Sequence, residues 1–464
     1  MKKTIKLAVV AAMALGTTSA FATNGDVMIG QGAKSRGMGG IGIAKSFGAE
    51  SALANPAMIT SVESFEITGA VTVFMPDVAF GSNAQSNAGA AFQPGANAPV
   101  VGINSADSAS DMSIIPEIYF AQRINESFAY GVAVAGTAGM GVDYSDTDFG
   151  MPSDNGSFQM KTALQLLKVA VPLTYELAGV TFAVAPVVQY GTLQMSHQGQ
   201  TGFAPMNPSA NPGPTNPMVP TFALHESPTS ADTGFGFEAG LAYNAKSIGL
   251  TVAGVYKSKI GMEYKDTIAK SVEKFGGAQA TGVASGDNLD QPAEFGIGIA
   301  YDIVNSGHTI AFDYKNIAWG SAAGYEDFGW ENQDVFAVGY EFAAKSWALR
   351  AGYNYASNPI AEQDGKTYSG AVKNFFNTAG FPGIVESHFT LGGGVAFTDL
   401  FSMDAAFIYA PETSVSYDTT AMTQAFAAQS AQANGMPGAP ATGASSAEVK
   451  HSQMGVTIAA TFKF

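Results

Sequence analysis

Residues 295–303 read FGIGIAYDI, and residues 308–319, which follow after a short break, read HTIAFDYKNIAW. In both segments every second residue is large and apolar, while most residues between them are small, polar or charged. This period of two predicts β-strands with one apolar face and one polar face. Residues 346–357, SWALRAGYNYAS, repeat the pattern, with Trp347 on the apolar face and Arg350 on the other.

The same alternation recurs along nearly the whole chain. We count fourteen segments, and most are long enough for a tilted strand to cross a bilayer, which takes roughly 9–11 residues. Fourteen is an even number, as bacterial outer-membrane barrels require. The sequence therefore predicts an all-β transmembrane protein, a 14-stranded antiparallel outer-membrane β-barrel formed by residues 64–464. The predicted strands are residues 65–74, 112–123, 128–136, 158–172, 180–195, 234–245, 248–264, 293–303, 308–319, 333–343, 346–357, 386–398, 401–411 and 448–464.

The connections between these segments fall into two length classes that alternate strictly. Short turns such as residues 344–345 alternate with long loops such as residues 196–233 and 265–292. In outer-membrane barrels the periplasmic turns are short and the outer loops are long, so both chain termini are expected in the periplasm. A soluble β-sandwich also alternates, but its exposed face carries more charge and its loops need not sort by length.

The start of the chain has the composition of an export signal. Three lysines precede the apolar run LAVVAAMAL, and small residues ending in Ala20-Phe21-Ala22 follow it. We therefore predict a signal peptide at residues 1–22. Removing its three lysines takes the formal net charge from -16 to -19, which argues against nucleic acid as a partner. The chain has no cysteine and, beyond the signal, no apolar run long enough for a spanning helix.

Residues 23–63 precede the first strand and do not alternate. They are glycine-rich and partly helical in character, so we predict that they fold into the barrel as a hatch; the alternative is a disordered periplasmic tail. Gly37, Gly39 and Gly42 also match the G-x-G-x-x-G spacing of dinucleotide sites. No apolar strand leads into the first of these glycines, so the spacing does not indicate a nucleotide site.

Two motifs in this segment carry a resemblance to a known family. GAKSRGMGG spans residues 32–40, and NPAM follows about fifteen residues later. With the strand starts at residues 291–298, 349–353 and 386–392, they make the chain similar to the FadL-type outer-membrane transporters, which import long-chain fatty acids and, in some branches, aromatic hydrocarbons. The resemblance covers the whole mature chain and implies a fourteen-stranded barrel with an N-terminal hatch. The residues expected to build the hatch are Arg36, Gly37, Gly39, Gly40, Asn55, Pro56 and Ala57.

The resemblance also implies a function. Hydrophobic small molecules would be captured by the outer loops, pass the lipopolysaccharide layer, enter a lumen pocket and leave sideways into the membrane, without a cofactor. The wall gap is expected in the third strand, where Gly136 and Gly139 weaken pairing. The candidate ligand-binding residues are Phe203, Met206, Met218, Phe222, Leu224, Ile268, Val272 and Phe275 in the loops, and Lys257, Lys315 and Arg350 in the lumen.

Purely structural roles stay open for these candidate residues. The loop residues also suit ordinary packing between loops, and the lumen cations also suit ion pairs with Asp313, Glu238 or Asp404. Two other functions are a diffusion porin, which predicts no plug, and a surface adhesin that uses the loop at residues 412–447. The five histidines are scattered without metal or triad spacing, so we expect no metal site and no enzyme. Family precedent favours a monomer.

Overall fold

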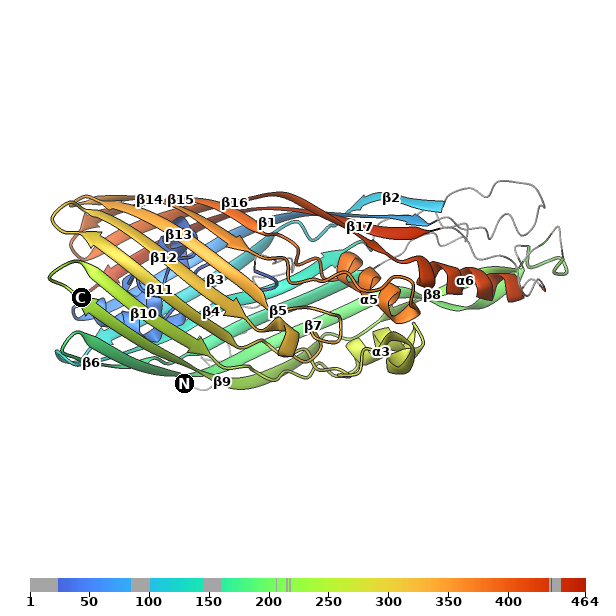
Figure 1. Ribbon diagram of the computed structural model, residues 1–464, viewed down its shortest axis with the longest axis horizontal. Coiled ribbons are helices and arrows are strands. Elements are labelled where there is room, and N and C mark those ends of the chain that lie inside the picture. The colour runs from blue at the N-terminus through green and yellow to red at the C-terminus, as the bar shows by residue number, and fades with distance from the viewer. Residues whose placement is uncertain are drawn as a thin grey trace.

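The computed structural model describes residues 24–84, 101–145, 160–205, 207–213, 216, 218–433, 435 and 444–464. The predicted signal peptide lies outside these residues. Within the described part of the chain, none of the helices is long and apolar enough to cross a membrane. The strands form one antiparallel sheet that closes on itself through the pairing of its first and last members (Figure 1).

Seventeen strand segments make up this sheet in the described residues. Two of them, β2 and β8, lengthen hairpins beyond the barrel, and β5 and β6 are two parts of one barrel strand separated at Pro172. Fourteen barrel strands remain, and the predicted fold is confirmed. The segments are β1 (Phe65–Ala84), β2 (Val101–Asp107), β3 (Ser113–Arg123), β4 (Phe128–Asp143), β5 (Lys161–Ala170), β6 (Leu173–Leu177), β7 (Val180–Pro205), β8 (Met218–Glu226), β9 (Ser230–Ala245), β10 (Leu250–Lys257), β11 (Glu294–Ile303), β12 (His308–Ile317), β13 (Gln333–Ala343), β14 (Trp347–Ala356), β15 (Ser387–Thr398), β16 (Phe401–Asp418) and β17 (Ser445–Lys463).

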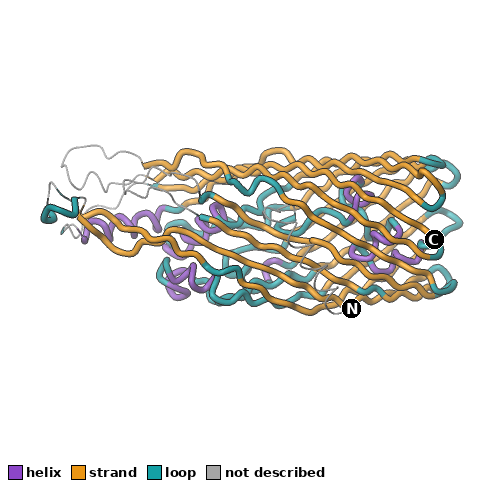
Figure 2. The backbone as a smooth tube through the Cα atoms, turned by 180° about the vertical axis from the view of Figure 1, so that it is seen from behind, coloured by secondary structure: helices purple, strands orange, loops and turns teal. Residues whose placement is uncertain are grey.

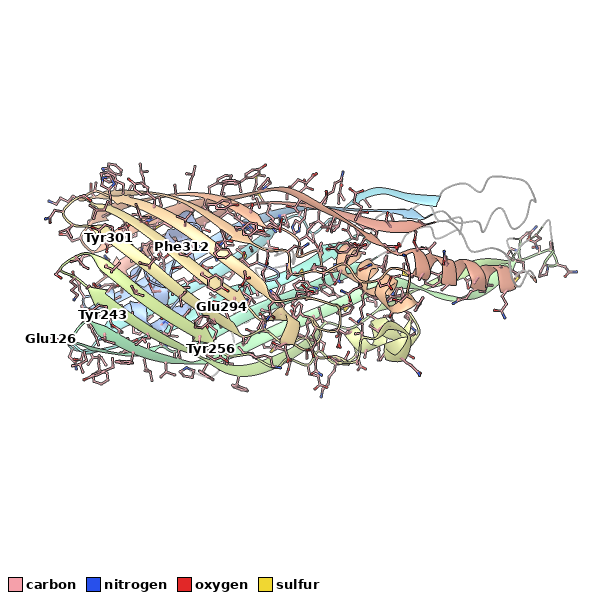
Figure 3. All side chains as sticks on the ribbon, viewed as in Figure 1. Glu126, Tyr243, Tyr256, Glu294, Tyr301 and Phe312 are labelled. Carbon is pink, nitrogen blue, oxygen red and sulfur yellow. The ribbon has the colours of Figure 1, made fainter. Side chains whose placement is uncertain are left out.

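The outer face of the barrel is apolar, as the alternation predicts. Along β11, Phe295, Ile297 and Ile299 are about half exposed, while the residues between them are buried. Tyr301 on the same strand is likewise exposed, as are Tyr243, Tyr256 and Phe312 on β9, β10 and β12 (Figure 3). Exposed large apolar side chains over a whole surface are unfavourable in water but favourable against lipid, so this face fits a bilayer.

Several strands run further than predicted. The predicted ends at residues 74, 136, 195 and 411 give way to observed ends at residues 84, 143, 205 and 418. The predicted strands end where a bilayer crossing is complete. Backbone N–H and C=O groups beyond the lipid still form hydrogen bonds with the neighbouring strand, so the strands continue. β7, with 26 residues, far exceeds the length needed to cross. In the opposite sense, β10 ends at Lys257 rather than at residue 264.

The N-terminal segment, residues 24–64, is mostly buried and packs against the inward faces of the barrel strands. It forms three short helices, α2 (Gly32–Gly37), η1 (Gly48–Leu53) and η2 (Pro56–Ser61). Figure 2 shows these helices within the end of the barrel that carries the short turns and the C-terminus. The segment thus occupies the lumen at this end.

The opposite end of the barrel carries the long loops. Their helices are α3 (Ile268–Glu273), α4 (Gly277–Thr281), η4 (Trp319–Ser321), α5 (Tyr368–Ala379) and α6 (Thr420–Ala433). Figure 1 shows β8 and α6 projecting furthest from the barrel, with α3 and α5 closer to it. After α5, residues 380–385 are all buried, so this loop also reaches the protein interior.

Candidate functional site

Arg36 anchors the N-terminal segment to the wall. Its guanidinium donates to Glu117 on β3 at 2.5 Å and to Thr72 on β1 at 2.8 Å, and both charged side chains are fully buried. Burial lowers the pKa of Arg36, but the nearby Glu117 carboxylate outweighs that effect and the pKa is raised. Removing either partner of such a pair would leave the other charge buried without a counterion, which is strongly destabilising.

A second charge network joins the segment to the strands opposite. Lys34 pairs with Glu50 at 3.1 Å and lies 3.8 Å from Asp404 on β16. Asp404 in turn accepts from Arg350 on β14, which also donates to Glu341 on β13, both at 2.7 Å. Arg350 therefore faces inward as predicted, but its donors are used by the wall itself.

The glycines of the N-terminal motif stand where the backbone meets the wall. Gly39 has a φ of +72°, and a Cβ there would lie 2.8 Å from the backbone of Tyr353. Gly37 faces Gly392 so closely that a Cβ would lie 2.9 Å from its Cα. Gly40, with φ +83°, turns the chain after them. These positions demand glycine for reasons of space and conformation, not for phosphate binding.

The NPA motif works as a cap. The Asn55 side chain accepts from the Ala57 N–H at 3.0 Å and donates to the Ile43 carbonyl at 2.8 Å, and Pro56 opens the helix η2. This arrangement satisfies a free backbone donor at the helix start and ties the two halves of the segment together.

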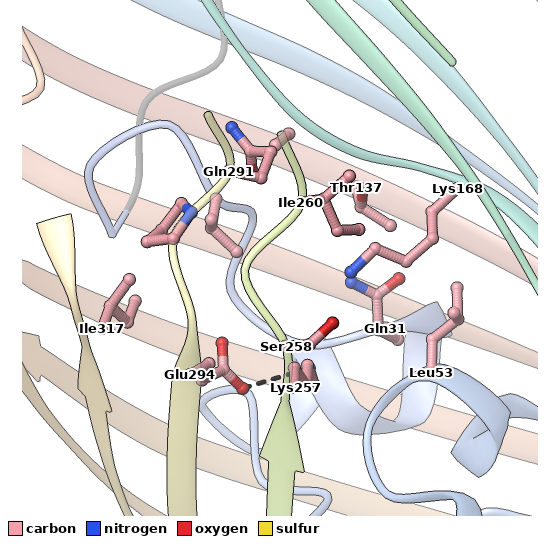
Figure 4. Close-up of a pocket in the computed structure, with 13 residues that line it drawn as sticks. Gln31, Leu53, Thr137, Lys168, Lys257, Ser258, Ile260, Gln291, Glu294 and Ile317 are labelled. Carbon is pink, nitrogen blue, oxygen red and sulfur yellow. Dashed lines mark ion pairs between the residues drawn. The ribbon is translucent and has the colours of Figure 1, made fainter. Parts of the chain in front are cut away.

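A cavity of about 50 Å³ lies between the N-terminal segment and the barrel wall (Figure 4). It has room for a few water molecules, since each needs roughly 10–15 Å³ by this measure. Apolar and charged side chains share its lining. The lining residues are Val27, Gln31, Leu53, Thr137, Ala138, Lys168, Lys257, Ser258, Ile260, Gln291, Pro292, Glu294 and Ile317.

The charges at this cavity come in pairs. Lys257 pairs with Glu294 at 3.1 Å, the dashed contact in Figure 4, and Lys168 pairs with Glu238 at 3.3 Å. Lys315, on the strand next to Glu294, makes no ion pair among the described residues. Its ammonium group is nevertheless within electrostatic reach of the carboxylates of Glu294 and Asp313. The structure places the predicted Lys257 and Lys315 on the two strands that flank β11.

The wall beside the cavity is interrupted. The β3–β4 ladder ends at the pair Glu117 and Ala135, although β3 begins at Ser113 and β4 continues to Asp143. Beyond that pair, the Asp143 carbonyl accepts from the N–H of Ala109, which lies in the connection before β3. The β4–β5 ladder shifts register between Gly136 and Ala138. Regular pairing is thus lost around Gly136 of β4, whereas Gly139 pairs in register with Gln165 of β5. That the wall opens at these two glycines stays a prediction.

The N-terminal segment docks on the same stretch of β4. Val27 forms an isolated antiparallel bridge with Ala138, flanked by the bonds from Met28 N–H to the Thr137 carbonyl and from Gly139 N–H to the Asp26 carbonyl, 3.0 and 2.9 Å long. Residues 26–28 therefore supply backbone partners to β4 from within the lumen, where β3 does not.

The Asp26 side chain adds hydrogen bonds that hold the docked segment in place. Its carboxylate accepts from Tyr325 at 2.5 Å and from Gln291 at 2.9 Å, and it is fully buried. Burial raises the pKa of Asp26 to about 6, although these two hydrogen bonds and Lys168 act in the opposite direction. The docked segment therefore carries a carboxyl group that takes up a proton more readily than a free one.

Aromatic side chains fill the interior at the loop end. Phe275, from the connection after α3, meets Phe376 of α5 at a ring-centroid distance of 5.0 Å and His197 of β7 at 5.5 Å. Phe375 and Phe328 extend the same group. This loop-end cluster is a buried apolar region built by several loops.

The predicted loop residues divide between this cluster and other places. Ile268, Val272 and Phe275 are buried in it, and α3 forms where the sequence shows an amphipathic turn. Phe203 and Met218 are partly buried on the hairpin of β7 and β8. Met206 lies outside the described residues, and the side chains of Phe222 and Leu224 are not among the described ones.

Sequence reasoning missed several members of the site. Lys168 is inward-facing by the same alternation that identified Lys257, so the signal was present. Phe375 and Phe376 lie in a long loop, where only the helical spacing of apolar residues in YSGAVKNFFNTA points to a buried face. Asp26 and Tyr325 lie far apart in the sequence and carry no local signal.

The residues described contain no group of three or more histidine, cysteine, aspartate or glutamate side chains placed to hold a metal ion. The site is thus characterised by apolar surface, paired charges and an interrupted wall.

Comparisons with known proteins agree with this architecture. The crystal structure of a Pseudomonas aeruginosa FadL homologue covers 95% of this chain and 100% of its own, with a TM-score of 0.67 and 16% identity. The Pseudomonas putida toluene transporter TodX covers 95% and 100%, with a TM-score of 0.62 and 16% identity. At these identities the likeness shows the fold.

A sequence relative and a family model go further. Outer membrane protein P1 of Haemophilus influenzae is 23% identical over 318 residues, which are 64% of this chain and 66% of that protein, just under two thirds of its length. The family model described as outer membrane protein transport protein (OMPP1/FadL/TodX) matches residues 8–464. Solved structures similar to this chain include the toluene transporter TodX and the monoaromatic hydrocarbon channel CymD. The chain therefore belongs to the OMPP1/FadL/TodX family of outer membrane transport proteins.

Proposed function

We propose that this protein carries hydrophobic small molecules passively across the outer membrane and releases them sideways into the bilayer. The short turns and both termini face the periplasm, and the long loops face the outside. The N-terminal segment acts as a hatch. The observation that carries the proposal is the interrupted β3–β4 ladder beside the lumen cavity, covered from within by residues 26–28.

Capture takes place at the loop-end cluster. Moving a methylene group from water into apolar surroundings gains about 0.8 kcal/mol, so a chain of a dozen methylenes gains on the order of 10 kcal/mol there. Release into periplasmic water would lose that gain. Exit into lipid keeps it, which is why a gap in the wall suits an apolar cargo better than a channel along the barrel axis.

Passage requires the N-terminal segment to move. The cavity of about 50 Å³ has room for water but not for a hydrocarbon, so cargo enters only when residues 24–28 leave β4. The same movement uncovers the interruption in the wall. A single displacement thereby links entry into the cavity to exit through the barrel.

The cargo is an aromatic hydrocarbon or a long-chain acid. TodX and TbuX are named as toluene transporters and CymD as a monoaromatic hydrocarbon channel, which supports the first class. Lysine side chains in the lumen support the second, with Lys257, which lines the cavity, and Lys315 as partners for a carboxylate. Uptake of each class by cells with and without the protein decides between them.

A disulfide tests the movement directly. Because the chain contains no cysteine, Val27→Cys with Ala138→Cys is a clean pair, and both side chains line the cavity at bridged positions. We expect oxidised cells to lose most uptake of toluene or a long-chain acid and reduced cells to recover it. The single Val27→Cys variant controls for the substitution. Uptake that is unchanged by the disulfide would overturn the proposal.

A further inference from the structure

Ile115 lies in the barrel wall at the point where β3 and β4 stop pairing. It stands two residues before Glu117, the residue of β3 at which the β3–β4 ladder ends, and on the same inward face. Its side chain is 1% exposed. On the other edge of β3, Ile115 remains in register with Thr72 of β1. One edge of β3 is thus held by a regular ladder at Ile115, while the other meets β4 beyond the end of its ladder.

A side chain, rather than backbone, closes the wall at this point. Where the β3–β4 ladder is intact, a Cβ at Gly131 would lie 2.6 Å from the Phe120 carbonyl oxygen of β3. Beyond the end of the ladder, a Cβ at Gly136 would lie 2.7 Å from Ile115 Cγ2. Apart from the two neighbours of Gly136 in the chain, Ile115 alone among the described residues comes within 4 Å of that position. Backbone hydrogen bonds fix the distance between strands, whereas an isoleucine side chain can change its rotamer.

Met28 connects this closure to the N-terminal segment. Its side chain is buried and forms a small apolar cluster with Ile115 and with Phe74 of β1. The Met28 backbone N–H donates to the Thr137 carbonyl of β4, which is one of the bonds that dock residues 26–28. Withdrawal of these residues from β4 therefore also removes a packing partner of Ile115.

The surroundings of Ile115 on the wall are fixed by polar contacts. Glu117 is tied to Arg36 by the fully buried ion pair described above. Thr72 accepts from Arg36 and shares a hydrogen bond of 2.8 Å with Thr457 of β17. A small movable apolar side chain is thus set in a rigid frame, so shortening it should widen the opening rather than let the wall collapse.

We propose that Ile115 is the specificity-determining residue of the sideways exit. When Met28 withdraws, the size of the Ile115 side chain sets the width of the opening beside Gly136, and with it the largest cross-section of cargo that leaves the lumen. Ile115 therefore favours slim apolar molecules over bulkier ones of equal polarity. This inference rests on the proposed sideways release and adds to it a selection by shape.

The test compares mesitylene with toluene, two neutral hydrocarbons that differ by two methyl groups. Uptake by intact cells that lack the protein is subtracted from uptake by cells that produce it, and the ratio of mesitylene to toluene is recorded. A fit that differs by one methylene changes discrimination by roughly tenfold or more. We therefore expect Ile115→Ala, which removes three carbon atoms, to raise the ratio about tenfold, and Ile115→Phe to lower it.

A matched control comes from the same strand. Ile118 lies on the outer face of β3 and is 56% exposed, so Ile118→Ala removes the same three carbon atoms on the lipid side and should leave the ratio unchanged. Hexadecanoic acid and its methyl-branched analogue form a second pair of probes, so that both proposed classes of cargo are covered.

The outcomes separate the inference from the proposed function. If the wild type takes up neither pair above the background, the proposed function fails and the selection at Ile115 with it. If a slim compound is taken up but the ratio is the same in the wild type, Ile115→Ala and Ile115→Phe, the selection is overturned while transport stands. An equal rise in Ile118→Ala would overturn it too. Ile115→Val, which removes one carbon atom, carries the test if Ile115→Ala does not fold, since the heat-dependent migration of each variant shows whether its barrel has formed.

Discussion

The two ends of the lumen are held together by different kinds of contact. At the short-turn end, the N-terminal segment is held by buried charge pairs such as Arg36–Glu117 and by glycine contacts that leave no space. At the loop end, Phe275 and Phe376 with their neighbours pack without directional bonds. Charge pairs tolerate little displacement, whereas apolar side chains rearrange at small cost.

This difference matches what each end must do in the proposed mechanism. The short-turn end has to exclude polar solutes, so it needs one fixed arrangement. The loop end has to accept apolar molecules of varied shape, so it needs an adaptable surface. Substitutions at the first end should therefore produce leakage, and those at the second should change uptake without leakage.

The largest effect is expected from Arg36→Ala. It leaves Glu117 buried without its cation, which costs about 3–5 kcal/mol in comparable pairs. The N-terminal segment should then detach, and ion conductance through the protein in planar bilayers should rise strongly. Thermal unfolding followed by gel migration measures the accompanying loss of stability.

Two further variants sharpen this result. The double variant Arg36→Met with Glu117→Leu removes both charges and should recover much of the stability. Lys246→Ala breaks a long, exposed pair with Glu176 and should change nothing measurable. A conductance that stays at the wild-type level in Arg36→Ala would show that the charge pair does not seal this end.

The next largest effect is expected from Gly39→Ala. The new Cβ would meet the Tyr353 backbone at 2.8 Å in a left-handed conformation, at a combined cost of about 3 kcal/mol. Gly277→Ala is the matched control, because Gly277 has φ +73° and no neighbour within 4 Å. Leakage in the first variant alone assigns the effect to lost contact with the wall, and equal leakage in both would contradict it.

The sequence predicts the barrel but not the contacts within the site, and the reason is physical. Alternation reports which face a side chain occupies, and it placed Arg350 and Lys257 in the lumen correctly. It contains no information on register across strands, so the partners of Arg350, Glu341 and Asp404, came only from the structure. From the sequence alone, Asp404 is one of three candidate ion-pair partners for the lumen cations.

The features near the wall interruption show the same limit. Gly136 marks a weak position in β4, yet glycine is too frequent in this chain to be decisive alone. The docking of Val27 on Ala138 joins residues that are more than a hundred positions apart. Contacts of this kind depend on how the closed barrel brings its inner faces together, which no local pattern encodes.

A smaller effect is expected from pH at Asp26. Its pKa is about 6 when docked and 3.8 when free, so the docked state takes up the proton first as pH falls. Docking should therefore strengthen by about 1 kcal/mol between pH 7 and pH 5, and weaken again as pH rises. Trp319, which lies against Gly25, reports docking through its fluorescence.

Asp26→Asn should remove this pH dependence while keeping the segment docked, since an amide oxygen still accepts from Tyr325. A pH response that survives in Asp26→Asn would show that a group other than Asp26 causes it. Docking that weakens from pH 7 to pH 5 in the wild type would contradict the sign of the effect.

The smallest effect is expected at the loop end, from Phe275→Leu. Leucine keeps most of the apolar surface, so the barrel should remain as stable to within about 1.5 kcal/mol. Uptake of toluene should fall only about twofold to fivefold, because Phe375, Phe376 and Phe328 still line the cluster. Conductance to ions should not change, since no charge pair at the short-turn end is touched. If Phe275→Leu increases ion conductance, the two ends are mechanically coupled, and the proposed separation of capture from sealing is wrong. A fall in uptake without leakage would show that capture and sealing are separate properties of one lumen.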